Sequence, residues 1–139
     1  MMSGFRGHVI DAVVKYCDEN GQEPFIWVEV DDACLVNRNY VRNGGIVLDL
    51  SSDAVGDLRI QDGWISFRCD FSDEPDSLVC LPVGRVVRVG PASSPGDGAH
   101  FFAEPSTDEI RSSCPYPQEV YGDGGVVRQF RPRRNRTPD

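Results

Sequence analysis

The chain has 139 residues, a formal net charge of −8 at pH 7 and 40% hydrophobic residues. A body of about 100 residues can bury roughly 60–70% of its unfolded surface, which is enough for one core, and an acidic surface repels phosphate backbones, which argues against nucleic acid as the main partner. No apolar run reaches the ~20 residues of a transmembrane helix, and Asp11 interrupts the apolar start, so we expect a cytoplasmic protein with no membrane partner.

Residues 5–19 have the one convincing helix pattern. Their apolar side chains recur at the spacing of a single helical stripe: Phe5, Val9, Ile10, Val13, Val14 and Cys17. Ser3 is a candidate N-cap, and Asn20-Gly21 offers a left-handed C-terminal stop. A lone amphipathic helix must bury its stripe on a sheet or on a second copy of itself. We expect five residues of this stripe to form a homodimer contact, namely Phe5, Val9, Ile10, Val13 and Val14.

From Phe25 the hydrophobic period changes to two, which is typical of strands. Asn43-Gly44-Gly45 and Asp62-Gly63 predict tight turns, because these residue types tolerate positive φ. The predicted strands are FIWVEV at 25–30, IVLDL at 46–50, LRI at 58–60, WISFRCDF at 64–71, SLVCLPV at 77–83, RVVRV at 85–89 and FFAEP at 101–105. This pattern predicts a mainly β meander, either a small Sm-like barrel or a two-sheet sandwich, with one N-terminal α-helix packed outside.

Beyond Pro105 the composition changes. We predict a folded domain at 1–105, a flexible linker at 106–125 and a basic-hydrophobic tail at 126–139, with the C-terminal tail disordered. The last sixteen residues, GGVVRQFRPRRNRTPD, carry five arginines against one aspartate, a net charge of +4, which leaves −12 on residues 1–123. The tail therefore differs chemically from the body.

Candidate catalytic groups are few. His8 and His100 belong to no zinc-binding or nucleophile spacing, and no glycine-rich phosphate loop precedes a helix. Five scattered cysteines without a CxxC pair favour buried free thiols over a metal site, a redox site or a disulfide framework. We expect a binding protein that is not an enzyme and has no metal and no cofactor. A hydrolase built on Cys69 and His100 has little support.

One segment carries a resemblance to a known family. Residues 37–58, NRNYVRNGGIVLDLSSDAVGDL, resemble the stringent starvation protein B family in having a tyrosine, an Asn-Gly turn, an Ile-Val-Leu strand and an Ala-Val-Gly step before a leucine. The corresponding positions are Tyr40, Asn43-Gly44, Ile46-Val47-Leu48, Ala54-Val55-Gly56 and Leu58. The likeness extends over most of residues 5–105, including FRCDF at 67–71, LPV at 81–83 and the closing GDGAHFFAEP.

The resemblance implies an adaptor for the ClpXP protease. Family members form homodimers through their N-terminal helices, hold an ssrA-type degradation tag in a groove of the small β-domain, and dock a C-terminal peptide on the N-terminal domain of the ClpX unfoldase. The implied groove residues, matched by position, are Val36, Arg38, Tyr40, Ala54, Phe67, Cys69, Asp70, Phe71 and His100. In the implied docking tail, Val126, Val127 and Phe130 are apolar anchors, and Arg128 and Arg131 are flanking charges.

Three positions depart from the family pattern. Val36 is followed by Asn37, where family members commonly have a proline after the valine. Asp57 replaces an asparagine, and Asp70 replaces an arginine. Because the family's tag is acidic in its middle, Asp70 is expected to weaken that contact or redirect specificity. Without the resemblance, Phe67, Cys69 and Phe71 would be interpreted as an ordinary buried strand face. The alternative function is an RNA-binding small-barrel module that uses its arginine-rich tail.

Overall fold

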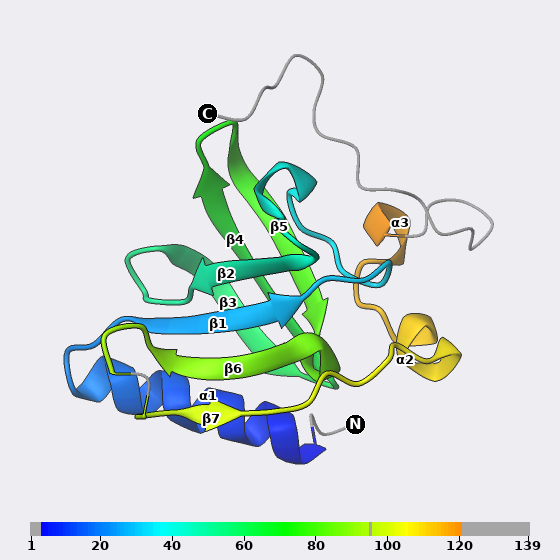
Figure 1. Cartoon of the computed structure of the whole chain (residues 1–139). Coiled ribbons are helices and arrows are strands. Elements are labelled where there is room, and N and C mark those ends of the chain that lie inside the picture. Colours follow the sequence, from blue (N-terminus) through cyan, green and yellow to red (C-terminus); the bar gives the residue numbers. More distant parts are fainter. Residues whose placement is uncertain (1–3, 95, 121–139) are drawn as a thin grey trace.

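The structure is a computed structural model that describes residues 4–94 and 96–120 (Figure 1). It confirms the mainly β fold class with an N-terminal helix. The long elements are α1 (Gly4–Glu19), β1 (Pro24–Glu29), β2 (Gly45–Asp49), β3 (Val55–Gln61), β4 (Trp64–Phe71), β5 (Glu74–Pro82) and β6 (Val86–Pro91). The short ones are η1 (Arg38–Tyr40), η2 (Val83–Arg85), β7 (Ala99–His100), α2 (Asp108–Ser112) and α3 (Pro117–Val120).

The strands form two antiparallel sheets, one in the order β2-β1-β6-β7 and one in the order β3-β4-β5. Of the two predicted architectures, the described strands therefore adopt the two-sheet arrangement and not a closed barrel. The strands of the two sheets cross steeply in Figure 1. Their facing sides share one core, in which Ile26 pairs with Leu48 and Val89 across the first sheet and Phe67 pairs with Val79 in the second.

The two predicted tight turns are present. Asn43 and Gly44 have φ values of 53° and 76°, and the flanking Arg42 and Gly45 exchange backbone hydrogen bonds of 2.8 and 2.9 Å. Asp62 and Gly63, with φ values of 57° and 85°, join β3 to β4 in the same way. Positive φ at consecutive residues is the property of the hairpin turn whose twist matches that of the strands.

The predicted closing strand at 101–105 is not formed. Among the described residues β7 is the last strand, and the chain after it makes isolated backbone hydrogen bonds, from the N–H of Phe101 to the carbonyl of Val87 and from the N–H of Glu104 to the carbonyl of Gly84. The Phe102 carbonyl instead accepts a 2.8 Å hydrogen bond from the Arg6 guanidinium, and the Phe102 ring is 93% exposed. This carbonyl therefore has a side-chain donor as its partner and not the backbone N–H of a neighbouring strand.

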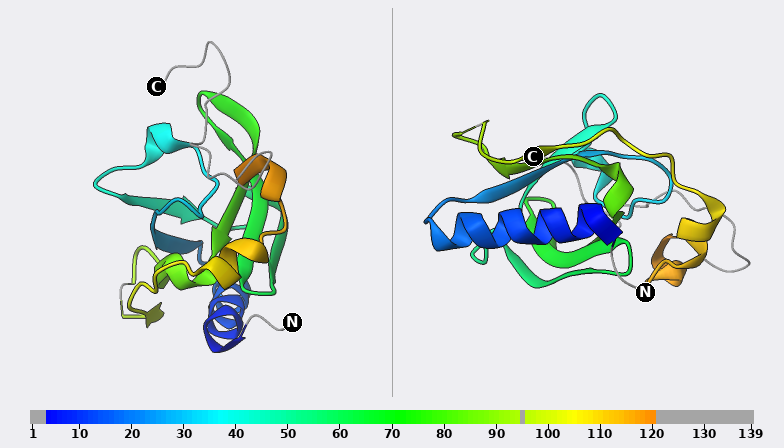
Figure 2. Two further views of the ribbon diagram at one scale, coloured as in Figure 1. Left: turned by 90° about the vertical axis from the view of Figure 1, so that its right-hand side faces the viewer. Right: turned by 90° about the horizontal axis from the view of Figure 1, so that it is seen from below.

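Helix α1 closes one end of the sandwich, where it contacts strands of both sheets (Figure 2). Ile10, Val14 and Cys17 form its buried face, so these side chains serve the intramolecular packing. Phe5 and Tyr16 point outward and are 81% and 51% exposed. The predicted stripe is thus divided between the sheets and solvent.

The chain after Pro105 differs from the coil expected of a flexible linker. Residues 106–120 carry α2 and α3, and Cys114 is buried in a second cluster with Ala33, Leu35, Trp64 and Cys80, on the outer side of the β3-β4-β5 sheet. The indole N–H of Trp64 donates a 3.0 Å hydrogen bond to the Ser113 hydroxyl. The predicted docking tail at 126–139 and the end of the predicted linker lie outside the described residues.

Candidate functional site

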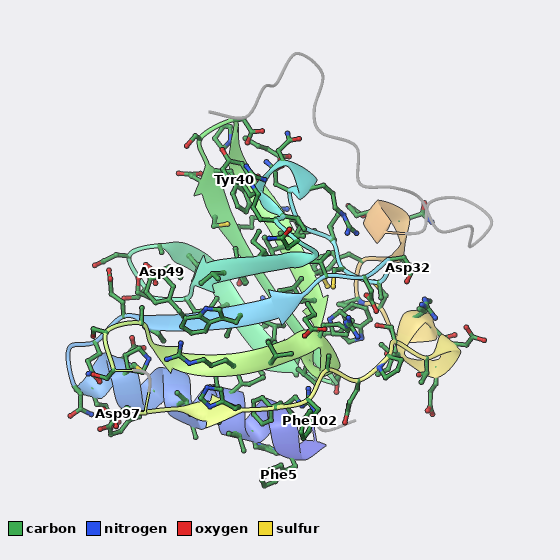
Figure 3. All side chains as sticks on the ribbon, viewed as in Figure 1. Phe5, Asp32, Tyr40, Asp49, Asp97 and Phe102 are labelled. Atoms are coloured by element: carbon green, nitrogen blue, oxygen red, sulfur yellow. The ribbon has the colours of Figure 1, made fainter. Side chains whose placement is uncertain are left out.

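An aromatic pair lies at the end of the sandwich opposite α1. The rings of Tyr40, from η1, and Phe71, from the end of β4, have centroids 4.9 Å apart. Both are half-buried, and Figure 3 shows Tyr40 at the far side of the molecule from Phe5. Cys69 shares the inward face of β4 with Phe71 and pairs with Val55, next to Ala54. The structure thus brings three predicted groove residues together, Tyr40, Cys69 and Phe71, and Ala54 directly precedes the partner of Cys69.

A hollow of about 370 Å³ adjoins this pair on the outer face of the first sheet. Its lining is mostly apolar and consists of Trp27, Val28, Glu29, Tyr40, Arg42, Gly45, Ile46, Val47 and Val87. Val47 is 50% exposed, so it offers an apolar side chain to the hollow. Because Tyr40 both lines the hollow and contacts Phe71, the two features meet at its ring.

Sequence reasoning did not assign Trp27, Arg42 or Val47 to a site. The available signal was the alternation in IVLDL, which placed Val47 on the face opposite the buried Ile46 and Leu48. Trp27 pairs with Val47 across β1 and β2. The Arg88 guanidinium lies 3.9 Å from the centre of the Trp27 indole, a cation–π contact that keeps the indole plane in place.

A hydrogen-bond network fixes η1 on the β4–β5 turn. Asn37 donates a 2.7 Å hydrogen bond to one carboxylate oxygen of Asp73, and Asn39 donates a 2.9 Å bond to the other. The Asn37 side-chain oxygen also caps η1 by accepting from the backbone N–H of Asn39. Since Tyr40 follows directly in η1, this network sets its position over Phe71. Asn37 therefore supplies both a cap for η1 and a link from η1 to the β4–β5 turn.

The charge on Asp73 depends on these donors. Burial disfavours the carboxylate, but the hydrogen bonds from Asn39 and Asn37 outweigh that effect and lower the pKa of Asp73 from its usual value. The Asp73 carboxylate is consequently ionised throughout the neutral pH range, and its two oxygens hold the amides in fixed orientations.

Two charged candidates have intramolecular partners. The Arg38 guanidinium donates to the carbonyls of Asp31 and Cys34, at 3.1 and 2.7 Å, and thereby holds the loop that precedes η1. Asp70 is exposed, and the alternation of β4 places it on the face opposite Cys69 and Phe71. One Asp70 carboxylate oxygen accepts a 2.7 Å hydrogen bond from the backbone N–H of Asp76.

The other predicted groove residues lie elsewhere. Val36 and Phe67 are 0% and 1% exposed and belong to the main core. His100 is exposed in β7, at the opposite edge of its sheet from β2. The structure therefore does not bring His100 next to Tyr40.

Burial makes two of the described thiols, those of Cys69 and Cys34, weak nucleophiles at neutral pH. Burial raises the pKa of Cys69 to about 11, with Asp70 and Glu74 adding to the effect, and raises that of Cys34 to about 12. Cys69 lies on β4 and His100 on β7, in different sheets.

Among residues 4–94 and 96–120 there is no group of three or more histidine, cysteine or acidic side chains suited to a metal ion. In the same residues no helix is long and apolar enough to cross a membrane.

Together these features define a small two-sheet β-protein with an N-terminal helix and an apolar, partly charged surface at the opposite end. The model of the family described as stringent starvation protein B matches residues 4–121. The chain is also 30% identical over 109 residues to the stringent starvation protein B homolog of Haemophilus influenzae, an alignment that covers 76% of this chain and 69% of that protein. The chain belongs to the stringent starvation protein B family.

The Asn37–Asn39–Asp73 network predicts a pH-dependent stability. A carboxylate whose pKa is lowered on folding stabilises the folded state above its unfolded pKa, and this contribution is lost as the pH falls through the folded pKa. We expect Asp73→Asn to lower the urea midpoint at pH 7 by about 0.5 M, and the difference from wild type to shrink below pH 4. Urea titrations at pH 7 and pH 2.5 measure both. Asp53→Asn, at an exposed position, is the control, and an equal effect of the two substitutions at pH 7 contradicts the network's role.

Proposed function

We propose that this chain is a cytoplasmic adaptor that binds polypeptides carrying an ssrA-type degradation tag and delivers them to the ClpXP protease. The observation that carries the proposal is the Tyr40–Phe71 pair and the adjoining apolar hollow, in a chain that belongs to the stringent starvation protein B family. An extended peptide gains specificity from side-chain pockets of this kind, and partly buried aromatic residues are the usual anchors of such contacts.

The proposed groove runs over Tyr40 between two sets of residues. On one side are Ala54, Cys69 and Phe71, and on the other are Trp27, Arg42 and Val47 of the hollow. Val36 and Phe67 support the groove from the core. Both arginines donate to backbone carbonyls, Arg38 to those of Asp31 and Cys34 and Arg42 to those of Asn39 and Val41. Of the two, Arg42 is exposed and lines the hollow, so it is the cation proposed to meet an acidic residue of the tag. We leave His100 out of the groove.

Tag binding is tested by fluorescence anisotropy with a labelled ssrA-type peptide. We expect saturable binding by the full chain and a loss of at least about 30-fold in affinity for Tyr40→Ala, because central aromatic anchors contribute about 2 kcal/mol or more. Val47→Glu, which places a charge in the hollow, is expected to weaken binding as well. The matched control is Phe102→Ala, which removes an exposed ring outside the groove. Equal affinities of the Tyr40→Ala and Phe102→Ala variants for the labelled peptide would contradict a binding groove at Tyr40.

Residues 126–139 are proposed as the contact with the N-terminal domain of ClpX, on sequence grounds alone. Their apolar Val126, Val127 and Phe130 alternate with arginines and differ in charge from the acidic body. A short tether between body and tail keeps the cargo near the unfoldase at an effective concentration of order millimolar, so a modest affinity of the tail is sufficient. Binding of the tagged polypeptide and binding of the unfoldase are then separable functions.

Truncation after Gly125 separates the two contacts. We expect the truncated chain to bind the tagged peptide with unchanged affinity but to lose its enhancement of ClpXP degradation of a tagged fluorescent reporter. Unchanged degradation after truncation contradicts docking through the tail. The RNA-binding alternative makes a different prediction, namely binding to RNA that weakens steeply with salt and disappears with the same truncation.

Homodimer formation through α1 is proposed from its outward face. Phe5, Val9, Ala12 and Tyr16 follow one another at i, i+4, i+7 and i+11, which places them on one stripe of the helix surface. This stripe is distinct from the buried residues Ile10, Val14 and Cys17. An exposed stripe with two aromatic rings is suited to packing against its symmetry mate.

Charge insertion into the stripe tests the dimer. We expect wild type to elute as a dimer in size-exclusion chromatography with light scattering, and the double variant Phe5→Lys/Tyr16→Lys to elute as a monomer with a retained circular dichroism spectrum. Asp18→Lys changes the charge at an exposed position of the same helix off the stripe and should leave the dimer intact. A monomeric wild type or a dimeric double variant contradicts the proposal.

A further inference from the structure

The segment 106–120 is held on the body by a small set of contacts around one buried cysteine. Ser106 donates a 2.6 Å hydrogen bond to Asp31, Arg111 forms a 2.7 Å ion pair with Asp32, and Trp64 bonds Ser113. Under these contacts Cys114, only 7% exposed, packs in one cluster with Cys80 of β5, which is fully buried. Two free cysteines that are 34 positions apart in sequence therefore meet where the C-terminal segment joins the second sheet.

We propose that Cys80 and Cys114 are a reversible disulfide site, whose oxidation covalently fastens the segment 106–120 to β5. The two residues differ in mobility. Cys80 is fixed by reciprocal backbone hydrogen bonds with Leu35, of 2.8 and 2.9 Å. Cys114 belongs to the peripheral segment, so local opening of that segment brings it to solvent while Cys80 stays in place.

The places of the two thiols in the fold give them different roles. Because Cys114 reaches solvent when its segment opens while Cys80 stays in β5, Cys114 is the nucleophile and Cys80 the resolving thiol. The contact between the thiols acts in the same direction: it lowers the pKa of Cys114 against the effect of burial and, together with burial, raises the pKa of Cys80. Cys34 lies nearby, but burial raises its pKa to about 12 and its thiol contacts Asp31.

Hydrogen peroxide is the oxidant that balances the reaction. The Cys114 thiolate attacks one peroxide oxygen, the O–O bond breaks, and Cys114 becomes a sulfenic acid as hydroxide leaves. The Cys80 sulfur then attacks the sulfenic sulfur, the S–O bond breaks, and a second hydroxide leaves and takes up the proton of the Cys80 thiol. In total two thiols and one peroxide give one disulfide and two water molecules. A dithiol reductant reverses the change with two electrons.

The disulfide alters the start of the C-terminal tail. In the reduced chain, release of residues 106–120 adds fifteen residues to the tether, whereas in the oxidised chain the tether begins beyond Cys114. The disulfide also closes a loop of over thirty residues, which restricts the unfolded chain. The effect on ClpXP delivery rests on the proposed function, but formation of the disulfide does not.

The test uses the full chain, reduced and then exposed to hydrogen peroxide. We expect a mass decrease of about 2 Da, protection of two thiols from alkylation, and a peptide map that links Cys80 to Cys114. We also expect a rise in Tm of about 10 °C that a dithiol reductant abolishes. Cys80→Ala and Cys114→Ser should each prevent the link and the rise, while Cys34→Ser and Cys17→Ser should preserve both.

Peptide mapping of the wild-type chain keeps the test decisive if a variant fails to fold. A map in which Cys80 pairs with Cys34, or in which Cys114 proceeds to sulfinic acid with Cys80 still alkylatable, overturns the proposal. Failure of the proposed function has a different signature, because a chain that binds no tagged peptide in either redox state can still form the Cys80–Cys114 link.

Discussion

Burial of β4 on both faces over its first half is the constraint on which the rest of the structure depends. Trp64, Ile65, Ser66 and Phe67 are all buried, so successive side chains need two separate hydrophobic layers. The main core covers the inward pair, and the segment 106–120 helps to cover the outward pair. Further along the same strand this double cover ends, and half-buried residues alternate with exposed ones up to Phe71. The surface proposed to bind a client thus lies at the end of β4 that the C-terminal segment leaves uncovered.

Local sequence signals account for much of the fold. The Asn43-Gly44 and Asp62-Gly63 turns need only their own backbone preferences, and the alternation in residues 64–71 matches the inward face of β4 residue by residue. The packing of residues 106–120 could not be predicted in this way, because Cys114 finds its apolar partners some 30 to 80 positions earlier in the chain. Isolated apolar residues between prolines resemble a linker until those partners are known.

The candidate site was predictable to the extent that it follows strand periodicity and the family resemblance. Tyr40, Cys69 and Phe71 were predicted and lie together. The roles of Arg38 and Asp70 were not predictable, because both bind backbone atoms of loops whose course no periodicity reveals. Asn37 shows the same limitation: in the sequence it is a single polar residue, but in the fold it is a helix cap and a link to Asp73.

The placement of the two tryptophans has a practical consequence. Trp27 lines the hollow beside Arg88, and the indole N–H of Trp64 is bonded to Ser113 of the C-terminal segment. Each region therefore contains its own intrinsic fluorophore. Emission from single-tryptophan variants can follow occupancy of the hollow and detachment of the segment separately, in real time and without any attached dye.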